Sequence, residues 1–155
     1  MKKIITITGH KNSKKDYVAE SLAKNSEVVF VRPYTDKQVP LGEIAEVYGD
    51  YHYVLKATLD SMIETEKVIS MITVNGNRYV YFEFQLTGTY NVLIVDDYGL
   101  LDLKDRWKGN VYSVLLYSVN QEQSKRVEEY LNRHEFDEVF DVDNDDIYEL
   151  EARIE

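Results

Sequence analysis

The chain has 155 residues, of which 44% are hydrophobic and 30% charged, and its formal net charge is −10. These values are typical of one globular domain with a real core, and the negative charge disfavours a nucleic-acid partner because it repels phosphate backbones. The absence of cysteine excludes disulfides and thiol catalysis. No apolar run has the length of a membrane span, so we expect a cytoplasmic protein without a membrane segment or signal peptide.

The first 24 residues have the layout of a phosphate-binding loop. An apolar strand over residues 3–8 is followed by a loop from Gly9 to Asp16, and the pattern predicts a helix over residues 14–24. Backbone N–H groups at the start of a helix attract anions, and a lysine there neutralises them. We therefore expect this loop to take a phosphate, a sulfate or the phosphate tail of a nucleotide.

The match to the loop pattern has two specific departures. Gly9 and Lys15 occupy the positions of the first glycine and the lysine, but Lys14 replaces the second glycine. Asp16 replaces the hydroxyl residue that would hold magnesium, and it places a negative charge beside the expected phosphate. The alternative is a tight turn in which Ser13 and Asp16 form a capping-box-like pair.

The middle third of the chain reads as β structure. A short apolar strand is expected over residues 27–31, and Pro33 and Pro40 then mark a loop. Asn75-Gly76-Asn77 is a hairpin signal, and Leu59, Met62 and Ile63 lie on one face of a predicted helix. The β segments are expected at residues 44–48, 51–55, 68–74 and 78–84, with the helix at residues 57–65. We expect this region to be antiparallel.

After Gly88 strands and helices alternate again. Strands are predicted at residues 91–95, 111–117 and 138–142, and helices at 100–107 and 121–133, before a last helix that carries Ile147, Leu150 and Ile154. Such alternation predicts an α/β fold, with a parallel sheet covered by helices on both faces and a small antiparallel insertion. We expect a single domain over residues 1–155, with its core at 1–34 and 88–155 and the insertion at about 35–87.

The order of these segments resembles the guanylate kinase family along nearly the whole chain. Residues 35–43 are similar to the family's motif of two threonines, an arginine, a proline, a second arginine and Gly-Glu. Gly76-Asn77-Arg78-Tyr79-Val80 is similar to the family's Gly-Asn-Tyr-Tyr-Gly hairpin. Further similar stretches are Asp50-Tyr51, Met62-Ile63, Val95-Asp96-Asp97-Tyr98-Gly99, Phe136-Asp137-Glu138-Val139 and Asn144-Asp145-Asp146. The resemblance implies a nucleoside-monophosphate-binding region in the middle third, with ATP and magnesium as cofactors if the protein is active.

The family's functional residues fall on definite positions here. The resemblance implies catalytic roles for Lys15 and Asp96. The implied nucleotide-binding loop residues are Gly9, Ser13, Lys14, Lys15 and Asp16, and the implied substrate contacts are Lys37, Tyr51, Ser70 and Tyr79. Lys37 and Pro40 replace the two phosphate-clamping arginines, and Ser70 replaces the glutamate that reads the guanine edge. Lysine lacks the bidentate fork of arginine, and a hydroxyl cannot accept two guanine N–H bonds as a carboxylate does.

The family also has an arginine-bearing lid after the strand at residues 111–117. Here one helix leads almost directly to the last strand, without room for a lid. Because phosphoryl transfer depends on positive groups and on excluding water, we expect a degenerate, non-catalytic protein. Three functions stay open: a binding or protein-interaction module, which the 13 tyrosines also favour; a small nucleoside monophosphate kinase of altered specificity; and a nucleotide-binding sensor.

Simpler interpretations of the individual residues stay open as well. Tyr51 and Tyr79 are alternatively ordinary strand aromatics, and Asp96-Asp97 is alternatively a turn. The three histidines show no spacing of metal ligands, and the acidic residues 141–146 lack the glycine and distal glutamate of a calcium loop. No metal site is predicted on either set of residues.

Overall fold

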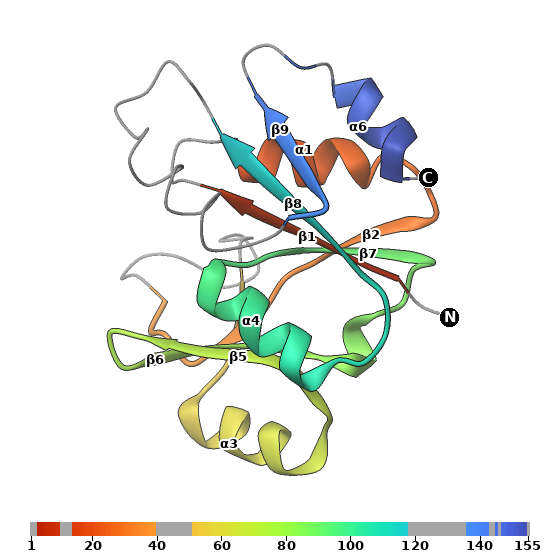
Figure 1. Cartoon of the computed structure of the whole chain (residues 1–155). Coiled ribbons are helices and arrows are strands. Elements are labelled where there is room, and N and C mark those ends of the chain that lie inside the picture. The colour runs from red at the N-terminus through yellow and green to blue at the C-terminus, as the bar shows by residue number, and fades with distance from the viewer. Residues whose placement is uncertain are drawn as a thin grey trace. The chain divides into compact units, whose positions relative to one another are not determined.

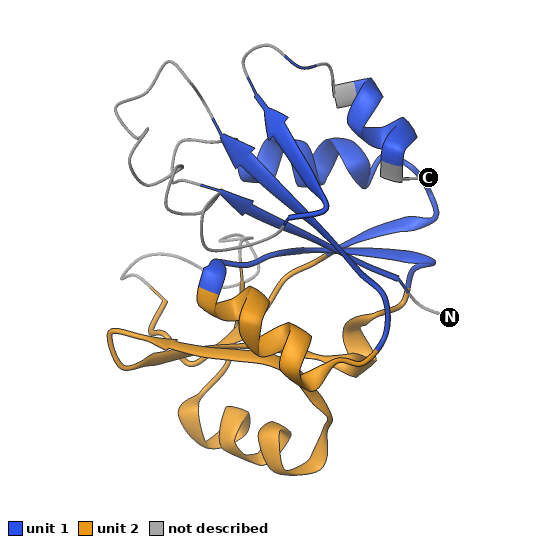
Figure 2. Cartoon of the chain, in the orientation of Figure 1, with its two compact units in different colours: residues 1–30, 88–97, 109–155 blue, residues 31–87, 98–108 orange. Residues whose placement is uncertain are grey.

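The computed structural model of the chain describes residues 3–9, 14–39, 51–117, 136–142, 145 and 147–154. The chain forms two compact units, one from residues 1–30, 88–97 and 109–155 and one from residues 31–87 and 98–108 (Figure 2). The β segment predicted at 44–48 and the helix predicted at 121–133 lie outside the described residues. Within the described parts, no helix is long and apolar enough to cross a membrane.

Unit 1 contains a five-stranded sheet in the order β2-β7-β1-β8-β9 (Figure 1). Its elements in chain order are β1 (Lys3–Gly9), α1 (Lys15–Leu22), β2 (Val28–Val31), β7 (Tyr90–Ile94), β8 (Val111–Tyr117), β9 (Glu138–Asp141) and α6 (Ile147–Ile154). Strand β1 lies in the middle and is parallel to β7 and β8, and β9 is parallel to β8. The predicted central parallel sheet, with its first strand followed by a helix, is confirmed.

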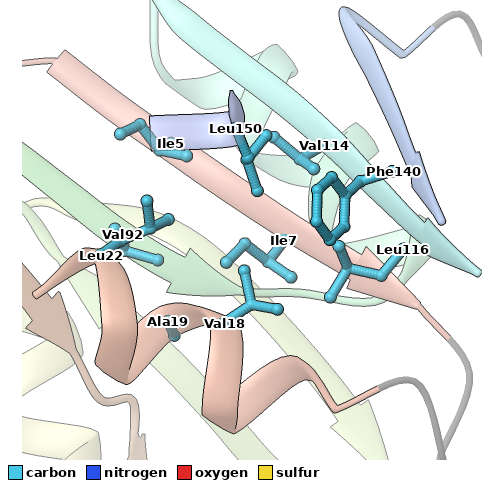
Figure 3. Packing of buried hydrophobic residues seen from close by; sticks show 10 residues of the cluster. All are labelled: Ile5, Ile7, Val18, Ala19, Leu22, Val92, Val114, Leu116, Phe140 and Leu150. Carbon is cyan, nitrogen blue, oxygen red and sulfur yellow. The ribbon is translucent and has the colours of Figure 1, made fainter. Parts of the chain in front are cut away.

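One face of this sheet forms a buried core with α1 and α6. Alternate residues of the strands meet the apolar stripe of α1, which recurs at helical spacing, as Figure 3 shows. The buried members are Ile5, Ile7, Val18, Ala19, Leu22, Val92, Val114, Leu116, Phe140 and Leu150. On β1 the intervening residues Ile4, Thr6 and Thr8 are buried as well, so the sheet is covered on both faces, as expected.

Unit 2 contains a four-stranded sheet in the order β4-β3-β6-β5. Its elements are β3 (Tyr34–Thr35), β4 (His52–Tyr53), α3 (Lys56–Thr65), β5 (Val68–Val74), β6 (Asn77–Phe82), a 3₁₀ turn (Glu83–Gln85) and α4 (Asp97–Arg106), which begins at the unit boundary. Strands β5 and β6 form the predicted hairpin. Its turn residues Asn75 and Gly76 have φ angles of 51° and 80°, the left-handed conformation that an Asn-Gly pair adopts readily.

Helix α3 packs on one face of the unit 2 sheet. Leu59 of α3 is fully buried against Val80 and Phe82 of β6. Because side chains alternate along a strand, Tyr79 lies on the opposite face, together with Thr35, which pairs with it in the ladder. The sheet therefore has one apolar face toward α3 and one face that carries hydroxyl groups.

The middle of the chain departs from the prediction in two respects. Strand β3 pairs in parallel with β4, so this region is a mixed sheet and not a wholly antiparallel one. Residues Tyr34–Thr35 were predicted as loop after Pro33, and the strand predicted at 51–55 is confined to His52–Tyr53. The reason is a long-range pairing, in which His52 N donates to Pro33 O (2.9 Å) and Val54 N donates to Thr35 O (3.0 Å).

Candidate functional site

The predicted site residues lie in both units, and each half is described by itself. In unit 1, α1 begins at Lys15, which is half-buried, and Lys14 is its N-cap residue. Lys14 has φ 61° and ψ 36°, a left-handed conformation that glycine adopts most easily. The phosphate-loop pattern has its second glycine at this position, so the backbone adopts a glycine-like conformation even though the side chain is lysine.

The side chain of the N-cap residue Lys14 makes no capping hydrogen bond to the first turn of α1. The N–H of Val18 donates to Lys14 O at 3.1 Å, and it is the first N–H of the helix with an acceptor inside the helix. The N-cap residue is Lys14, whereas the capping-box alternative placed the cap at Ser13. Ser13 itself lies outside the described residues. The N–H groups of Asp16 and Tyr17 are directed out of the end of the helix, where an anion is favoured.

Asp96 lies at the carboxyl edge of the unit 1 sheet. Ile7 of β1 is in register with Ile94 of β7, and Val95 N donates to Ile7 O at 3.1 Å. The same register brings Gly9 and the half-buried Asp96 to one edge, which is where open parallel sheets bind ligands. Helix α4 begins at Asp97 and not at residue 100 as predicted, so Asp97 lies in the first turn of a helix and Asp96 directly precedes that helix.

In unit 2, two of the predicted substrate residues come together. The ring centroids of Tyr51 and Tyr79 are 5.3 Å apart and their planes are inclined at 61°. Tyr53 approaches Tyr51 with a centroid distance of 5.9 Å, and it is in register with Thr35. The hydroxyl-bearing face of the sheet therefore carries a tyrosine cluster, which we define as Tyr51, Tyr53 and Tyr79. Edge-to-face rings of this kind offer both apolar surface and hydroxyl donors.

The other two predicted substrate residues differ in their surroundings. Lys37 is exposed, and its backbone N–H donates to the hydroxyl of Thr35 at 3.1 Å. Ser70 is only 2% exposed, and its hydroxyl donates to the carbonyl oxygen of Gly99 in α4 at 3.1 Å. This contact commits the one proton of the Ser70 hydroxyl to the protein, and the small buried side chain offers no carboxylate for a base.

An ion pair beside these residues was not predicted. Arg78 of β6 donates from Nε to Asp36 Oδ2 and from its backbone N–H to Asp36 Oδ1, both at 2.8 Å. Burial alone would raise the pKa of the Asp36 carboxyl, but the hydrogen bonds and charge of Arg78 lower that pKa below its usual value of 3.8. Asp36 in turn raises the pKa of the Arg78 guanidinium. The sequence holds one sign of this ion pair, since Asp36 and Arg78 both differ from the residues that the guanylate kinase motifs have at these positions.

The described residues at these positions supply a helix N-terminus with lysines, a cluster of tyrosine rings and separate carboxylates. Among these residues, no group of three or more His, Asp or Glu side chains lies close enough together to hold a metal. Asp96 presents one carboxylate at the edge of the sheet, and magnesium is usually held by one or two carboxylates together with oxygens of the substrate. Asp16 supplies a second carboxylate in the first turn of α1, in place of a hydroxyl.

Two guanylate kinases are similar to this chain, one in sequence and one in fold. No profile of a known protein family matches the chain. A guanylate kinase from Geobacter metallireducens is 30% identical over 100 residues, which cover 61% of this chain and 48% of that protein. The chain therefore spans about half the length of the curated relative that it matches. The solved structure of guanylate kinase from Anaplasma phagocytophilum has a TM-score of 0.68 and 21% identity, and the match covers 99% of this chain and 82% of that chain. The predicted likeness is confirmed in sequence and in fold.

Proposed function

Because its sequence and its fold both relate this chain to the guanylate kinase family, we propose that it binds a nucleotide without efficient phosphoryl transfer. The observation that carries this proposal is the first turn of α1. Its N-cap, Lys14, has backbone angles that glycine adopts most easily and makes no side-chain cap, and Lys15 follows as the first helical residue. Such a turn stabilises a phosphate through N–H groups, the helix dipole and a lysine.

The groups that accelerate transfer are reduced in this chain. The hydroxyl position is Asp16, and the two phosphate-clamping positions are Lys37 and Pro40. Lysine gives a point charge where arginine gives two parallel hydrogen bonds, and proline gives neither. Removal of one preorganised charge-stabilising group costs on the order of a hundredfold in rate, so the combined loss supports a binding role.

The ligand proposed for the unit 2 half is a nucleoside monophosphate held by ring contacts. The tyrosine cluster supplies aromatic surface and hydroxyl groups, and Lys37 supplies one exposed cation. Ser70 has no carboxylate, and its hydroxyl donates a hydrogen bond to Gly99 O. We therefore expect this half to discriminate weakly between guanine and adenine. ATP and magnesium remain the proposed ligands of the unit 1 half.

A second candidate function is protein interaction, supported by exposed aromatic side chains. Tyr17 is 60%, Tyr98 70% and Tyr148 74% exposed, although tyrosine commonly buries its ring. Tyrosine is enriched at protein interfaces, so these residues are the ones to substitute in a test of partner binding.

A titration with ATP–magnesium tests the anion-binding half. We expect Lys15→Ala to weaken binding about tenfold or more, because a charged hydrogen bond to phosphate is lost. Asp16→Ser should strengthen binding, because it removes a like charge and restores a hydroxyl. Lys24→Ala is the matched control, since exposed Lys24 follows the opposite end of the same helix, and it should change the affinity by less than about twofold.

The same titration can refute the proposal. If Lys15→Ala binds as well as the wild type, or Asp16→Ser binds no better, the first turn of α1 is only a structural turn. Added salt should weaken genuine binding, because exposed charges are screened over about 10 Å at 0.1 M ionic strength.

A further inference from the structure

Arg78 lies at the centre of a polar network in unit 2. Besides its two bonds to Asp36, its Nη1 lies 2.7 Å from Asp60 Oδ1 in α3, and its Nη2 donates to Lys56 O at 3.4 Å. The Asp36 side chain is 6% exposed and that of Arg78 is 21% exposed, whereas that of Asp60 is 52% exposed. Each guanidinium nitrogen therefore has an acceptor, and one side chain connects β6, the end of β3 and the start of α3.

The two ends of the main ion pair are 42 residues apart in the chain. Asp36 stands where the family motif has its second threonine, and Arg78 stands where the Gly-Asn-Tyr-Tyr-Gly hairpin has its first tyrosine. Both residues therefore differ from the family's motifs. They carry opposite charges, and Arg78 Nε lies 2.8 Å from Asp36 Oδ2. Asp36, whose side chain is 6% exposed, would be left buried and lose this partner without Arg78, which is costly.

The network adjoins two of the predicted substrate residues along the chain. Asp36 precedes Lys37, whose N–H donates to Thr35, and Thr35 is in register with Tyr79, the neighbour of Arg78. Two carboxylates neutralise the Arg78 charge, so this arginine is poorly suited to hold a phosphate itself. Its contacts instead join the backbone at residue 78 to the Asp36 side chain, next to Lys37.

We propose that Arg78 is a positioning residue that, through Asp36, holds Lys37 and Tyr79 in the arrangement that binds a nucleoside monophosphate. This inference rests on the proposed function, and it adds a chain-specific charged clamp, defined as Arg78, Asp36 and Asp60, to the binding face. Asp36 and Arg78 of the clamp stand at the two positions where the family motifs have a neutral threonine and a neutral tyrosine.

The test uses the full chain and guanosine monophosphate as the probe, with affinity measured by NMR titration well below the melting temperature. Arg78→Met keeps the aliphatic stem and removes the hydrogen bonds, and we expect it to weaken binding about tenfold or more, because misplaced binding groups lose affinity. Arg106→Met is the matched control, because Arg106 is in the same unit and its ion pair to Asp102 at 2.9 Å is formed within one helix, α4. It should change affinity by less than about twofold.

A rescue variant separates positioning from direct contact. Asp36→Thr combined with Arg78→Tyr supplies the family's neutral pair, and it should restore affinity to within about threefold of the wild type. If Arg78→Met binds like the wild type, or if the double variant is as weak as Arg78→Met, the positioning role is refuted. Should Arg78→Met fail to fold, Arg78→Lys keeps the charge without the fork, and wild-type affinity in that variant would refute the role equally.

Hydrogen exchange of the amides tests the positioning role of Arg78 without a ligand. In Arg78→Met the amides of Lys37 and Val54 should exchange about tenfold faster or more, because the segment they anchor to loosens. Unchanged exchange at both amides overturns the inference, whatever the titration shows. If exchange rises but the wild type binds no guanosine monophosphate, the proposed function fails while the positioning of this segment stands.

Discussion

Lys14 combines a left-handed backbone with a bulky side chain at the start of α1. For a residue with a Cβ atom, this conformation costs roughly 1–2 kcal/mol relative to right-handed angles. Glycine avoids that cost, although its freedom in the unfolded chain offsets part of the gain. The strain at Lys14 is therefore a local cost at the same turn that carries the proposed anion site.

Two substitutions at this residue measure the strain. Lys14→Gly and Lys14→Ala remove the same charge, but only glycine removes Cβ. We predict that Lys14→Gly has a free energy of unfolding about 1 kcal/mol higher than Lys14→Ala, from urea denaturation of both proteins. An alanine variant as stable as the glycine variant would show that Lys14 is not strained in the folded protein.

At the scale of secondary-structure elements, the Arg78–Asp36 pair makes the free energy of unfolding depend on pH. The Asp36 pKa is lower in the folded protein than its usual value of 3.8, so its stabilisation is present above that value and is lost as the pH falls through the folded pKa. We predict that Asp36→Asn lowers the free energy of unfolding by about 2 kcal/mol at pH 7. The gap between variant and wild type should begin to narrow as the pH falls below about 3.8, measured by denaturation from pH 7 to pH 3. A gap that is constant over this range would contradict the assignment.

The sequence predicted the elements whose signals are local. The apolar runs gave the strands of unit 1, Asn75-Gly76 gave the hairpin, and the loop pattern gave the order of strand, turn and helix at Lys15. Helix α4 was predicted too short, because Asp97 and Tyr98 add no apolar periodicity to its first turn.

The sequence could not predict the features that depend on distant partners. Strand β3 has only two residues after Pro33, and it is held by β4 and β6, which follow much later in the chain. Two further contacts also join segments far apart in sequence. Arg78 pairs with Asp36, and the Ser70 hydroxyl donates a hydrogen bond to Gly99 O. Periodicity carries no information on such contacts, and the departures from the family motifs at residues 36 and 78 bear on the ion pair alone.

At the scale of the whole molecule, the two units are interleaved in the sequence. Unit 1 is formed from three segments and unit 2 from two, so neither is one continuous piece of chain. Unfolding of one unit therefore releases the ends of the segments that form the other. We expect the chain to unfold in one cooperative transition, as a single domain does.

One substitution tests this cooperativity. Leu150 is fully buried in the unit 1 core, and Leu150→Ala should lower the free energy of unfolding by about 3 kcal/mol. Trp107 is the one tryptophan of the chain and belongs to unit 2, so its fluorescence reports on that unit. We predict that Leu150→Ala shifts the fluorescence and circular-dichroism midpoints together, whereas Leu55→Ala, at a residue 78% exposed, shifts neither. A fluorescence midpoint that stays fixed would mean that the units unfold independently.

The central claim, binding without efficient transfer, is tested most directly by phosphorus NMR of the protein mixed with ATP, magnesium and guanosine monophosphate. One set of spectra reports both binding, as shifted or broadened nucleotide resonances, and turnover, as the growth of diphosphate signals. The account predicts perturbed resonances and no diphosphate above the level of an Asp96→Ala control. Rapid formation of guanosine diphosphate by the wild type, or resonances that the protein leaves unchanged, would contradict it.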